Sequence, residues 1–199
     1  GDYDLEIIGR IRDWRGIPAD YGLRYEQDFE DPAAIGDYRF AAPDTWRIGG
    51  DDGNHWLEHV PGSGYRPRHR SPLNVAILAT PSVESFVLDV DLMQTGRDYG
   101  HRDLCIFFGV RDPEHFYYAH QGLVRDAISN QLLKVDKGPR KPIGQTNEAT
   151  PWDKGWHQIK LVRRVQDGTI ELYFDDMQKP AKTAADKDFA WGRIRTGDA

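Results

Sequence analysis

The chain consists of short runs of alternating or β-branched and aromatic residues, and helical periodicity is almost absent. Each run closes on Gly, Pro, Asp or Asn, the residues that end strands and form turns. About a dozen such runs, in a chain with 20 Gly and 12 Pro, predict an all-β sandwich or barrel. The expected strands are 5–11, 23–29, 45–48, 54–60, 74–79, 84–94, 103–109, 114–121, 131–136, 156–165, 169–175 and 192–196.

Two tight turns predict part of the strand pairing. Residues 156–164 alternate over nine positions, and Asp167-Gly168 follows before the chain returns along 169–175. An Asp-Gly pair between two such runs is a strong hairpin signal. The turn at 51–54 predicts a second hairpin in the same way.

Alternation also predicts one apolar strand face and one helical turn. Along 85–92 the apolar face consists of Phe86, Leu88, Val90 and Leu92. A helical turn is expected within 31–38.

Length and charge exclude several classes of protein. A chain of 199 residues favours one domain over 1–199, with residues 1–22 as an extra or permuted N-terminal strand and loop. The net charge of -6 argues against a nucleic-acid partner. No apolar run approaches the roughly 18 residues of a membrane span. The opening residues show no targeting signal.

The single cysteine, Cys105, excludes an intrachain disulfide and a Cys-rich metal site. It alternates with Asp103 and Phe107, so it is expected to be buried or to line a groove, without zinc.

Two stretches resemble a known superfamily. They are PheValLeuAspValAspLeu to HisPheTyrTyrAlaHis at 86–120, and TrpHisGlnIleLysLeuValArg to PheAlaTrpGlyArgIle at 156–194. Together they resemble the concanavalin A-like lectin/glucanase superfamily, and within it bacterial 3-keto-disaccharide hydrolase or laminin-G-like domains. The resemblance implies a jelly roll of two antiparallel sheets. It also implies a glycan groove on the concave sheet and a secreted or periplasmic location.

The sequence departs from that family at its usual polar positions. Phe108 stands where many members carry Arg, and Tyr118 and His120 replace Glu and Gln. The Glu-x-Asp-x-x-Glu motif of family 16 glucanases is absent, which argues against retaining hydrolysis by that route. The residue types of jelly-roll alginate lyases occur here, but not their strand motifs.

The run HisPheTyrTyrAlaHisGln at 115–121 is the main candidate for chemistry. On a strand, Phe116, Tyr118 and His120 share one face, and His115, Tyr117 and Gln121 share the other. Either face presents a His and a Tyr, which can transfer protons near neutral pH. The alternative is that the aromatic residues are core and the histidines cap loops.

Asp103 is expected beside His120. If 103–109 pairs with 114–121 through a turn at 110–113, Gly109 lies near Glu114 and Asp103 lies next to His120 or Gln121. An Asp in that place fixes the tautomer of a histidine. A strand-end Asp that binds loop amides is the alternative.

A basic run at 65–70 contains three arginines in a net-acidic chain. Arginine binds carboxylates in bidentate fashion, so the run favours a uronate-containing glycan. A solvated loop is the plain alternative. The expected substrate-binding residues are Arg66, Arg68, His69, Arg70, Arg102 and Gln121.

No cofactor is expected. Acidic pairs at 28–31 and 175–176 leave a structural Ca²⁺ as an open alternative. Histidines at 55 and 59 would lie about 13 Å apart on a strand, which argues against zinc.

Two functions from different classes remain. One is an enzyme, a polysaccharide lyase or glycoside hydrolase, in which an arginine neutralises the uronate carboxylate. His120 or Tyr118 would then remove the C5 proton, with Asp103 orienting and with Tyr117 and His115 in reserve. The other is a non-catalytic glycan-binding module that stacks Trp and Tyr on sugar faces.

Overall fold

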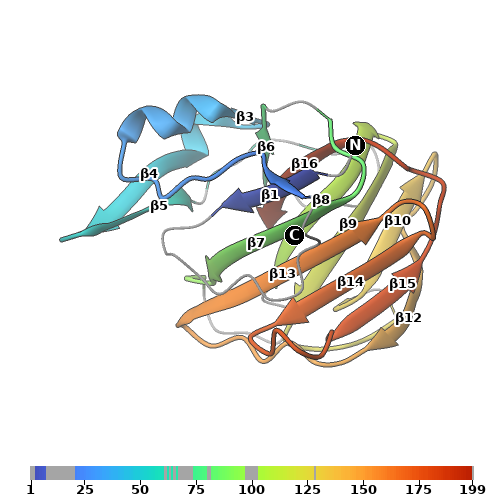
Figure 1. Ribbon diagram of the computed structural model, residues 1–199. Coiled ribbons are helices and arrows are strands. Elements are labelled where there is room, and N and C mark those ends of the chain that lie inside the picture. The colour runs from blue at the N-terminus through green and yellow to red at the C-terminus, as the bar shows by residue number, and fades with distance from the viewer. Residues whose placement is uncertain are drawn as a thin grey trace.

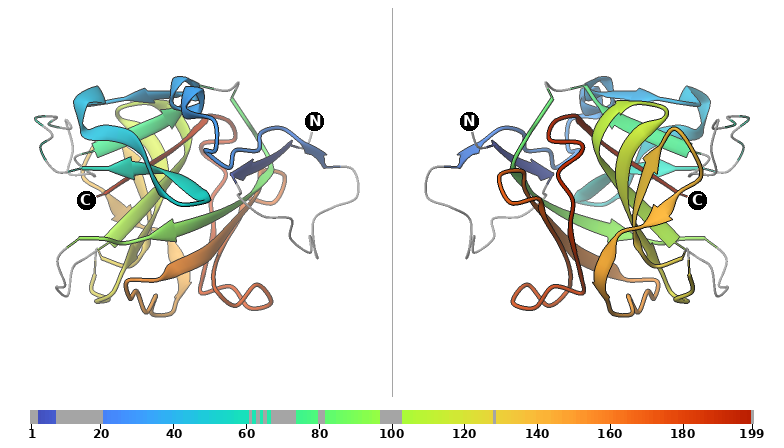
Figure 2. Two further views of the ribbon diagram at one scale, coloured as in Figure 1. Left: turned by 90° about the vertical axis from the view of Figure 1, so that its left-hand side faces the viewer. Right: turned by 90° about the vertical axis from the view of Figure 1, so that its right-hand side faces the viewer.

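A computed structural model of the protein describes residues 3–7, 21–60, 62, 64, 66, 74–79, 82–96, 103–127 and 129–198. The described chain is almost entirely β, as the strand pattern predicted, and its two large sheets face each other (Figures 1 and 2). No helix among the described residues is long and apolar enough to cross a membrane.

The first sheet has seven strands. In spatial order they are β12 (Gly144–Asn147), β15 (Lys182–Ala185), β14 (Thr169–Phe174), β13 (Trp156–Arg164), β7 (Phe86–Met93), β1 (Tyr3–Ile7) and β2 (Gly22–Leu23). The expected hairpin is present: β13 pairs with β14, and Gly168 takes a positive φ of 83° in the turn. From β12 to β7 the sheet is antiparallel, whereas β1 is parallel to both β7 and β2.

The second sheet also has seven strands. In order they are β11 (Lys141–Pro142), β10 (Leu132–Asp136), β9 (His115–Gly122), β8 (Asp103–Asp112), β16 (Arg193–Asp198), β6 (Asn74–Leu78) and β3 (Tyr38–Phe40). The last strand of the chain, β16, lies between β8 and β6, antiparallel to both. The first described strand, β1, lies in the opposite sheet, between β7 and β2.

A separate hairpin projects from one end of the sandwich (Figure 1). It consists of β4 (Trp46–Asp51) and β5 (Asn54–His59), joined by the turn predicted at 51–54. The predicted helical turn is the 3₁₀ helix η1 (Pro32–Asp37), and a second one, η2 (Pro43–Thr45), leads into β4.

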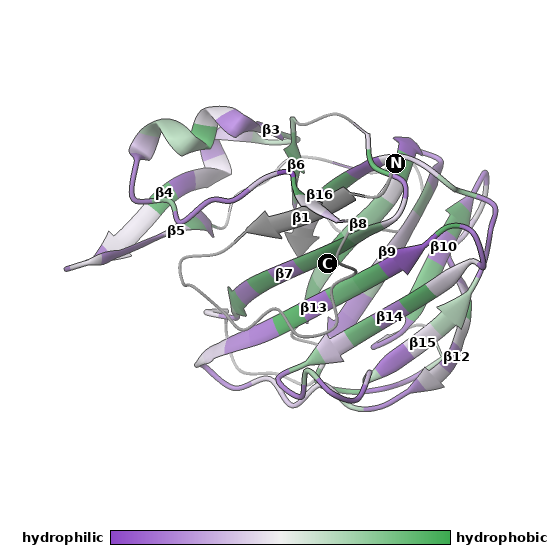
Figure 3. Cartoon of the chain, viewed as in Figure 1, coloured by the Kyte–Doolittle hydropathy of each residue, from purple (hydrophilic) through white to green (hydrophobic). Residues whose placement is uncertain are grey.

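The main core fills the space between the two sheets. The predicted inner face of β7, with Phe86, Leu88 and Val90, belongs to this core, together with Ile106 and Phe108 of β8. Buried and more exposed residues alternate along β13 and β14, and along β14 the hydropathy alternates with them (Figure 3). A second buried cluster, which includes Phe107, Phe116 and Tyr118, lies on the other face of the second sheet.

One expected strand differs from the structure, and four strands of the structure were not expected. The strand expected at 23–29 ends at Leu23, because side chains of Gln27 and Asp28 accept the backbone N–H groups of Phe29 and Glu30 in local turns. The four edge or near-edge strands β3, β11, β12 and β15 were missed, because they are short or mainly polar.

The turn between β8 and β9 is also placed differently. The ladder runs on to Asp112 and His115, so Gly109 does not lie at the turn near Glu114. Gly109 takes a positive φ of 59° where the register shifts, and this bulge lets pairing resume beyond it.

Lys182 is an unusual member of the core. Its side chain is fully buried on β15, and its Nζ has no hydrogen-bond partner among the described residues. Burial lowers the pKa of this amine to about 7. The charged form therefore opposes folding at neutral and acidic pH.

This burial predicts a pH-dependent stability. Between pH 7 and 10 the unfolded chain binds the lysine proton and the folded chain does not, so stability rises with pH by up to about 1.4 kcal/mol per unit. Lys182→Met should raise the free energy of unfolding at pH 7 and remove this slope, measured by urea denaturation across pH. Lys154→Met, at an exposed lysine, is the control. Equal slopes in wild type and Lys182→Met would contradict the prediction.

Candidate functional site

The three main predicted residues lie together on the outer face of the second sheet. Nε2 of His120 is 2.8 Å from Oδ2 of Asp103, so the expected contact is present, although Asp103 pairs with Gly122 and not with His120 or Gln121 in the ladder. The rings of Tyr118 and His120 are 6.4 Å apart. All three side chains are buried, so they form a packed cluster and do not present their polar atoms to solvent.

Both ring nitrogens of His120 are engaged. The backbone N–H of Asn130 donates to Nδ1 at 3.0 Å, so Nδ1 carries no proton and Nε2–H donates to Asp103. A lone pair is therefore available at neither nitrogen for a substrate proton or a metal ion. Among the described residues, one group of three side chains has its possible metal-ligand atoms within 4.8 Å of one another: Asp103, Cys105 and His120. The tautomer of His120 disfavours metal binding there, because neither ring nitrogen has a free lone pair.

Tyr118 is hydrogen-bonded to Arg140, a residue that was not predicted from the sequence to belong to the site. Nη1 of Arg140 donates to its hydroxyl at 3.0 Å. Burial raises the pKa of Tyr118 well above its ordinary value, so the phenol keeps its proton. Cys105 lies on the same face and is fully buried, as predicted.

The opposite face of β9 carries His115, Tyr117 and Gln121, as the alternation predicted. Tyr117 and Gln121 are fully buried, and the side-chain amide of Gln121 has no hydrogen-bond partner among the described residues. His115 is half-buried, with Nδ1 at 2.7 Å from Oδ2 of Asp112 and Nε2 at 3.6 Å from Oδ1 of Asp136.

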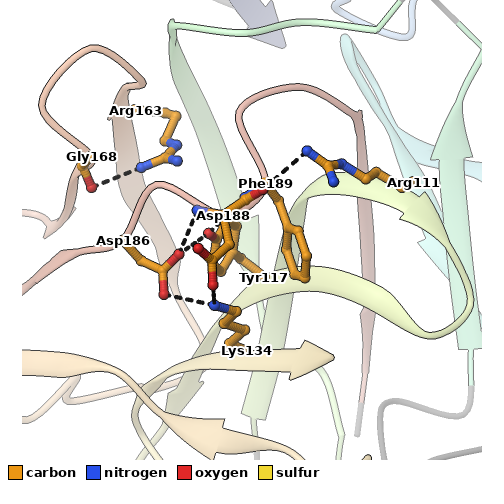
Figure 4. Close-up of polar contacts among 8 residues, drawn as sticks. All are labelled: Arg111, Tyr117, Lys134, Arg163, Gly168, Asp186, Asp188 and Phe189. Atoms are coloured by element: carbon orange, nitrogen blue, oxygen red, sulfur yellow. Dashed lines mark hydrogen bonds and ion pairs between the residues drawn. The ribbon is translucent and has the colours of Figure 1, made fainter. Parts of the chain in front are cut away.

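A polar network joins Tyr117 to the loop before β16 (Figure 4). The Tyr117 hydroxyl donates to Asp186 and accepts the backbone N–H of Phe189 at 3.0 Å. Lys134 bridges Asp186, at 2.9 Å, and Asp188. Burial raises the pKa of Tyr117, and the hydrogen bond to Asp186 raises it further, so the phenol keeps its proton. The network therefore fixes the loop and does not provide a reactive phenolate.

Of the predicted basic run at 65–70, the structure describes one residue. Arg66 is exposed, whereas Arg68, His69, Arg70 and Arg102 lie outside the described residues. Their convergence with His120 stays a prediction.

The acidic pairs have local partners. Asp31 accepts the N–H of Ala33 at the start of η1, and Asp175 accepts from Gln158. Asp176 accepts from Gln178. The structural Ca²⁺ stays a prediction.

A cleft of about 590 Å³ opens between the β4–β5 hairpin and the adjoining end of the sandwich. It is within the range of small-molecule sites. Residues from both sheets and the hairpin line it, the largest side chains being Phe29, Tyr38, Trp46, Trp56, Met93 and Trp156. None of the described residues predicted as site residues lines this cleft.

Two tryptophans lie side by side in the cleft. The rings of Trp56 on β5 and Trp156 at the start of β13 are 5.7 Å apart at 68°. The side chain of Trp156 is 45% exposed. β13 pairs Trp156 with Met93 at the end of β7, which places the ring at the edge of the sandwich.

Polar groups accompany the aromatic rings. Glu58, Asp91 and Gln94 line the cleft, and Glu58 binds Nε of Arg47 across the hairpin at 2.8 Å. Deeper inside, Nε1 of Trp46 and Oδ1 of Asn74 are buried and have no hydrogen-bond partner within the described chain. A ligand could supply an acceptor to the first and a donor to the second.

The sequence did not reveal this cleft because its residues are scattered over the chain. No motif connects Trp56, Asn74 and Trp156, which belong to three strands. The available signal was the count of 6 Trp in 199 residues, which does not indicate position.

The His120–Asp103 contact predicts a structural cost. Asp103→Ala leaves a buried N–H without its acceptor and should lower the free energy of unfolding by about 2–3 kcal/mol. Chemical denaturation measures this, and Glu148→Ala, which breaks an exposed ion pair to Lys179, should change little. An unchanged midpoint for Asp103→Ala would contradict a structural role.

Comparisons with known proteins bear on the fold. No protein-family model matches the sequence, and no curated protein matches it. The carbohydrate-binding module CBM66 of Bacillus subtilis is similar in structure, with a TM-score of 0.54 and 15% identity over 80% of this chain and 86% of that chain. The SPRY domain of human HERC1 gives a TM-score of 0.42 and 17% identity over 70% and 77%. The first likeness supports the β-sandwich fold, and the closer resemblance to 3-keto-disaccharide hydrolase domains stays a prediction.

Proposed function

We propose that the protein is a carbohydrate-binding module that takes its glycan in the cleft beside the β4–β5 hairpin. The observation that carries the proposal is the pair of tryptophans, Trp56 and Trp156, in an open cleft that also contains hydrogen-bonding groups. The resemblance to the concanavalin A-like superfamily supports the ligand class, and with it a secreted or periplasmic location.

The chemistry of the cleft suits a sugar ring. A pyranose has an apolar C–H face and a rim of hydroxyls, so it binds well where an aromatic ring lies next to hydrogen-bond acceptors. Trp156 offers a partly exposed ring, and the inclined ring of Trp56 offers a second surface. The carboxylates of Glu58 and Asp91 and the amide of Gln94 can accept sugar hydroxyls.

The structural neighbour supports the same class. CBM66 is a carbohydrate-binding module by its title, and its chain is similar to this one over most of both lengths.

Binding without cleavage is the function that we propose over lyase or hydrolase activity. The buried His120 and Asp103 satisfy each other, and Tyr118 and Tyr117 are held by Arg140 and Asp186. General acid–base catalysis needs groups that can reach a substrate and exchange a proton at neutral pH. These contacts favour a structural use of the four residues.

Charged groups of both signs line the cleft, so its charge favours neither a neutral nor an acidic sugar. Glu58, Asp91 and Arg195 line it, Glu58 pairs with Arg47, and Arg66 does not line it. A preference for acidic polymers stays a prediction of the arginine run, to be tested beside the neutral polymers.

Substitution of the cleft tryptophans tests the proposed function. Neutral and uronate-containing polysaccharides are compared by affinity electrophoresis, with released reducing ends and unsaturated products measured in parallel. Trp56→Ala and Trp156→Ala should each weaken binding about tenfold or more, since an aromatic anchor typically contributes more than 1.4 kcal/mol. No product should appear.

Trp191→Ala is the matched control. Trp191 is 50% exposed but does not line the cleft, and Arg111 stacks on its ring at 5.1 Å. This variant should bind like wild type. Loss of binding in Trp191→Ala alone, or steady release of product by the wild type, would contradict the proposal.

A further inference from the structure

The walls of the cleft are more apolar than a sugar requires. Leu57, Leu92, Met93 and Leu104 line it, and all four are only partly buried. Large aliphatic side chains left partly exposed in one concave site are unusual in a protein surface without a ligand. They come from three different strands, so the folded chain gathers them in one place.

The cleft continues inward to the core. Its floor includes Ala76, Leu78, Leu88 and Ile106, which belong to the main core between the sheets. A sugar placed that deep would bury hydroxyls against hydrocarbon, which costs several kcal/mol for each hydroxyl without a partner. A hydrocarbon chain in the same place would gain free energy from burial.

We propose that the preferred ligand is an amphiphilic glycan, in which a sugar carries an alkyl or acyl chain. The sugar lies against the adjoining rings of Trp56 and Trp156, and the chain lies inward along Leu92 and Leu104. This inference rests on the proposed function, because it assigns the sugar to the same tryptophans. It adds the class of substituent that fills the inner part of the cleft.

Two buried polar atoms in the lining of the cleft suit the linkage between the sugar and the chain. Trp46 is 9% exposed and Asn74 is 7% exposed, and Nε1 of the first and Oδ1 of the second lack partners among the described residues. Trp46 can donate to the ether or ester oxygen that links the chain, and Asn74 can accept a neighbouring hydroxyl. Both side chains belong to the lining, so such a linkage would satisfy polar atoms that an all-hydrocarbon ligand would leave unpaired.

A series of alkyl glucosides tests the inference. Methyl, hexyl and octyl β-glucoside are titrated into the protein by calorimetry, each below its micelle-forming concentration. Each methylene buried in the cleft should tighten binding about fourfold. Equal affinity for methyl and octyl glucoside would overturn the inference and leave glycan binding intact.

Variants in the wall locate the chain. Leu92→Gln keeps most of the side-chain volume at a partly buried position next to the core but makes the wall polar. It should reduce the gain from methyl to octyl at least fivefold and leave methyl glucoside binding unchanged. Leu23→Gln, at a 58% exposed leucine outside the cleft, should keep the full gain.

The outcomes separate the two proposals. A chain-length gain that survives Leu92→Gln would overturn the placement of the chain. Binding of octyl glucoside that is insensitive to Trp56→Ala and Trp156→Ala would overturn the amphiphilic ligand, since the sugar would then contribute nothing. Thermal unfolding of each variant confirms that the fold is kept.

Discussion

Burial of the two inner sheet faces against each other is the constraint on which the rest of the structure depends. Phe86, Leu88 and Val90 on β7 are covered by residues of the facing sheet such as Ile106 and Phe108. Where the β4–β5 hairpin leaves the sandwich, this apolar surface is incompletely filled and becomes the cleft. Core and candidate site are therefore continuous, which explains why the inner part of the cleft is hydrocarbon.

Local patterns in the sequence were sufficient for much of the fold. Alternation along 156–164 and the Asp-Gly turn predicted the β13–β14 hairpin. The expected pairing of β8 with β9 and the contact of Asp103 with His120 are also present, although the register of that pairing differs from the expected one. Period-two alternation cannot show whether the second face of a strand is exposed, because covering it takes other segments of the chain. Both faces of β9 proved buried, so a run that suggested reactive groups became part of the packing. The cleft could not be predicted, since Trp56, Asn74 and Trp156 meet only through tertiary structure.

Several polar side chains serve the fold rather than a reaction. Arg163 is 1% exposed, and its guanidinium lies 5.4 Å from the ring of Tyr117 while it donates to Gly168 O. Lys182 is buried without a carboxylate, at a cost that depends on pH. A histidine, tyrosine or aspartate in such surroundings has its proton and its partner fixed. Binding does not require such groups: the cleft offers the exposed ring of Trp156, the partly buried ring of Trp56 and a few polar atoms without partners among the described residues.

The indole N–H signals of the tryptophans report directly on where the ligand lies. A two-dimensional ¹H–¹⁵N spectrum, assigned with single Trp→Phe variants, is recorded during titration with an oligosaccharide of the polymer that binds most tightly. The signals of Trp46, Trp56 and Trp156 should shift together, while those of Trp191 and of Trp152, whose N–H donates to Gln121 O at 2.6 Å, stay in place. A shift confined to Trp191, with the three cleft signals unmoved, would contradict the account.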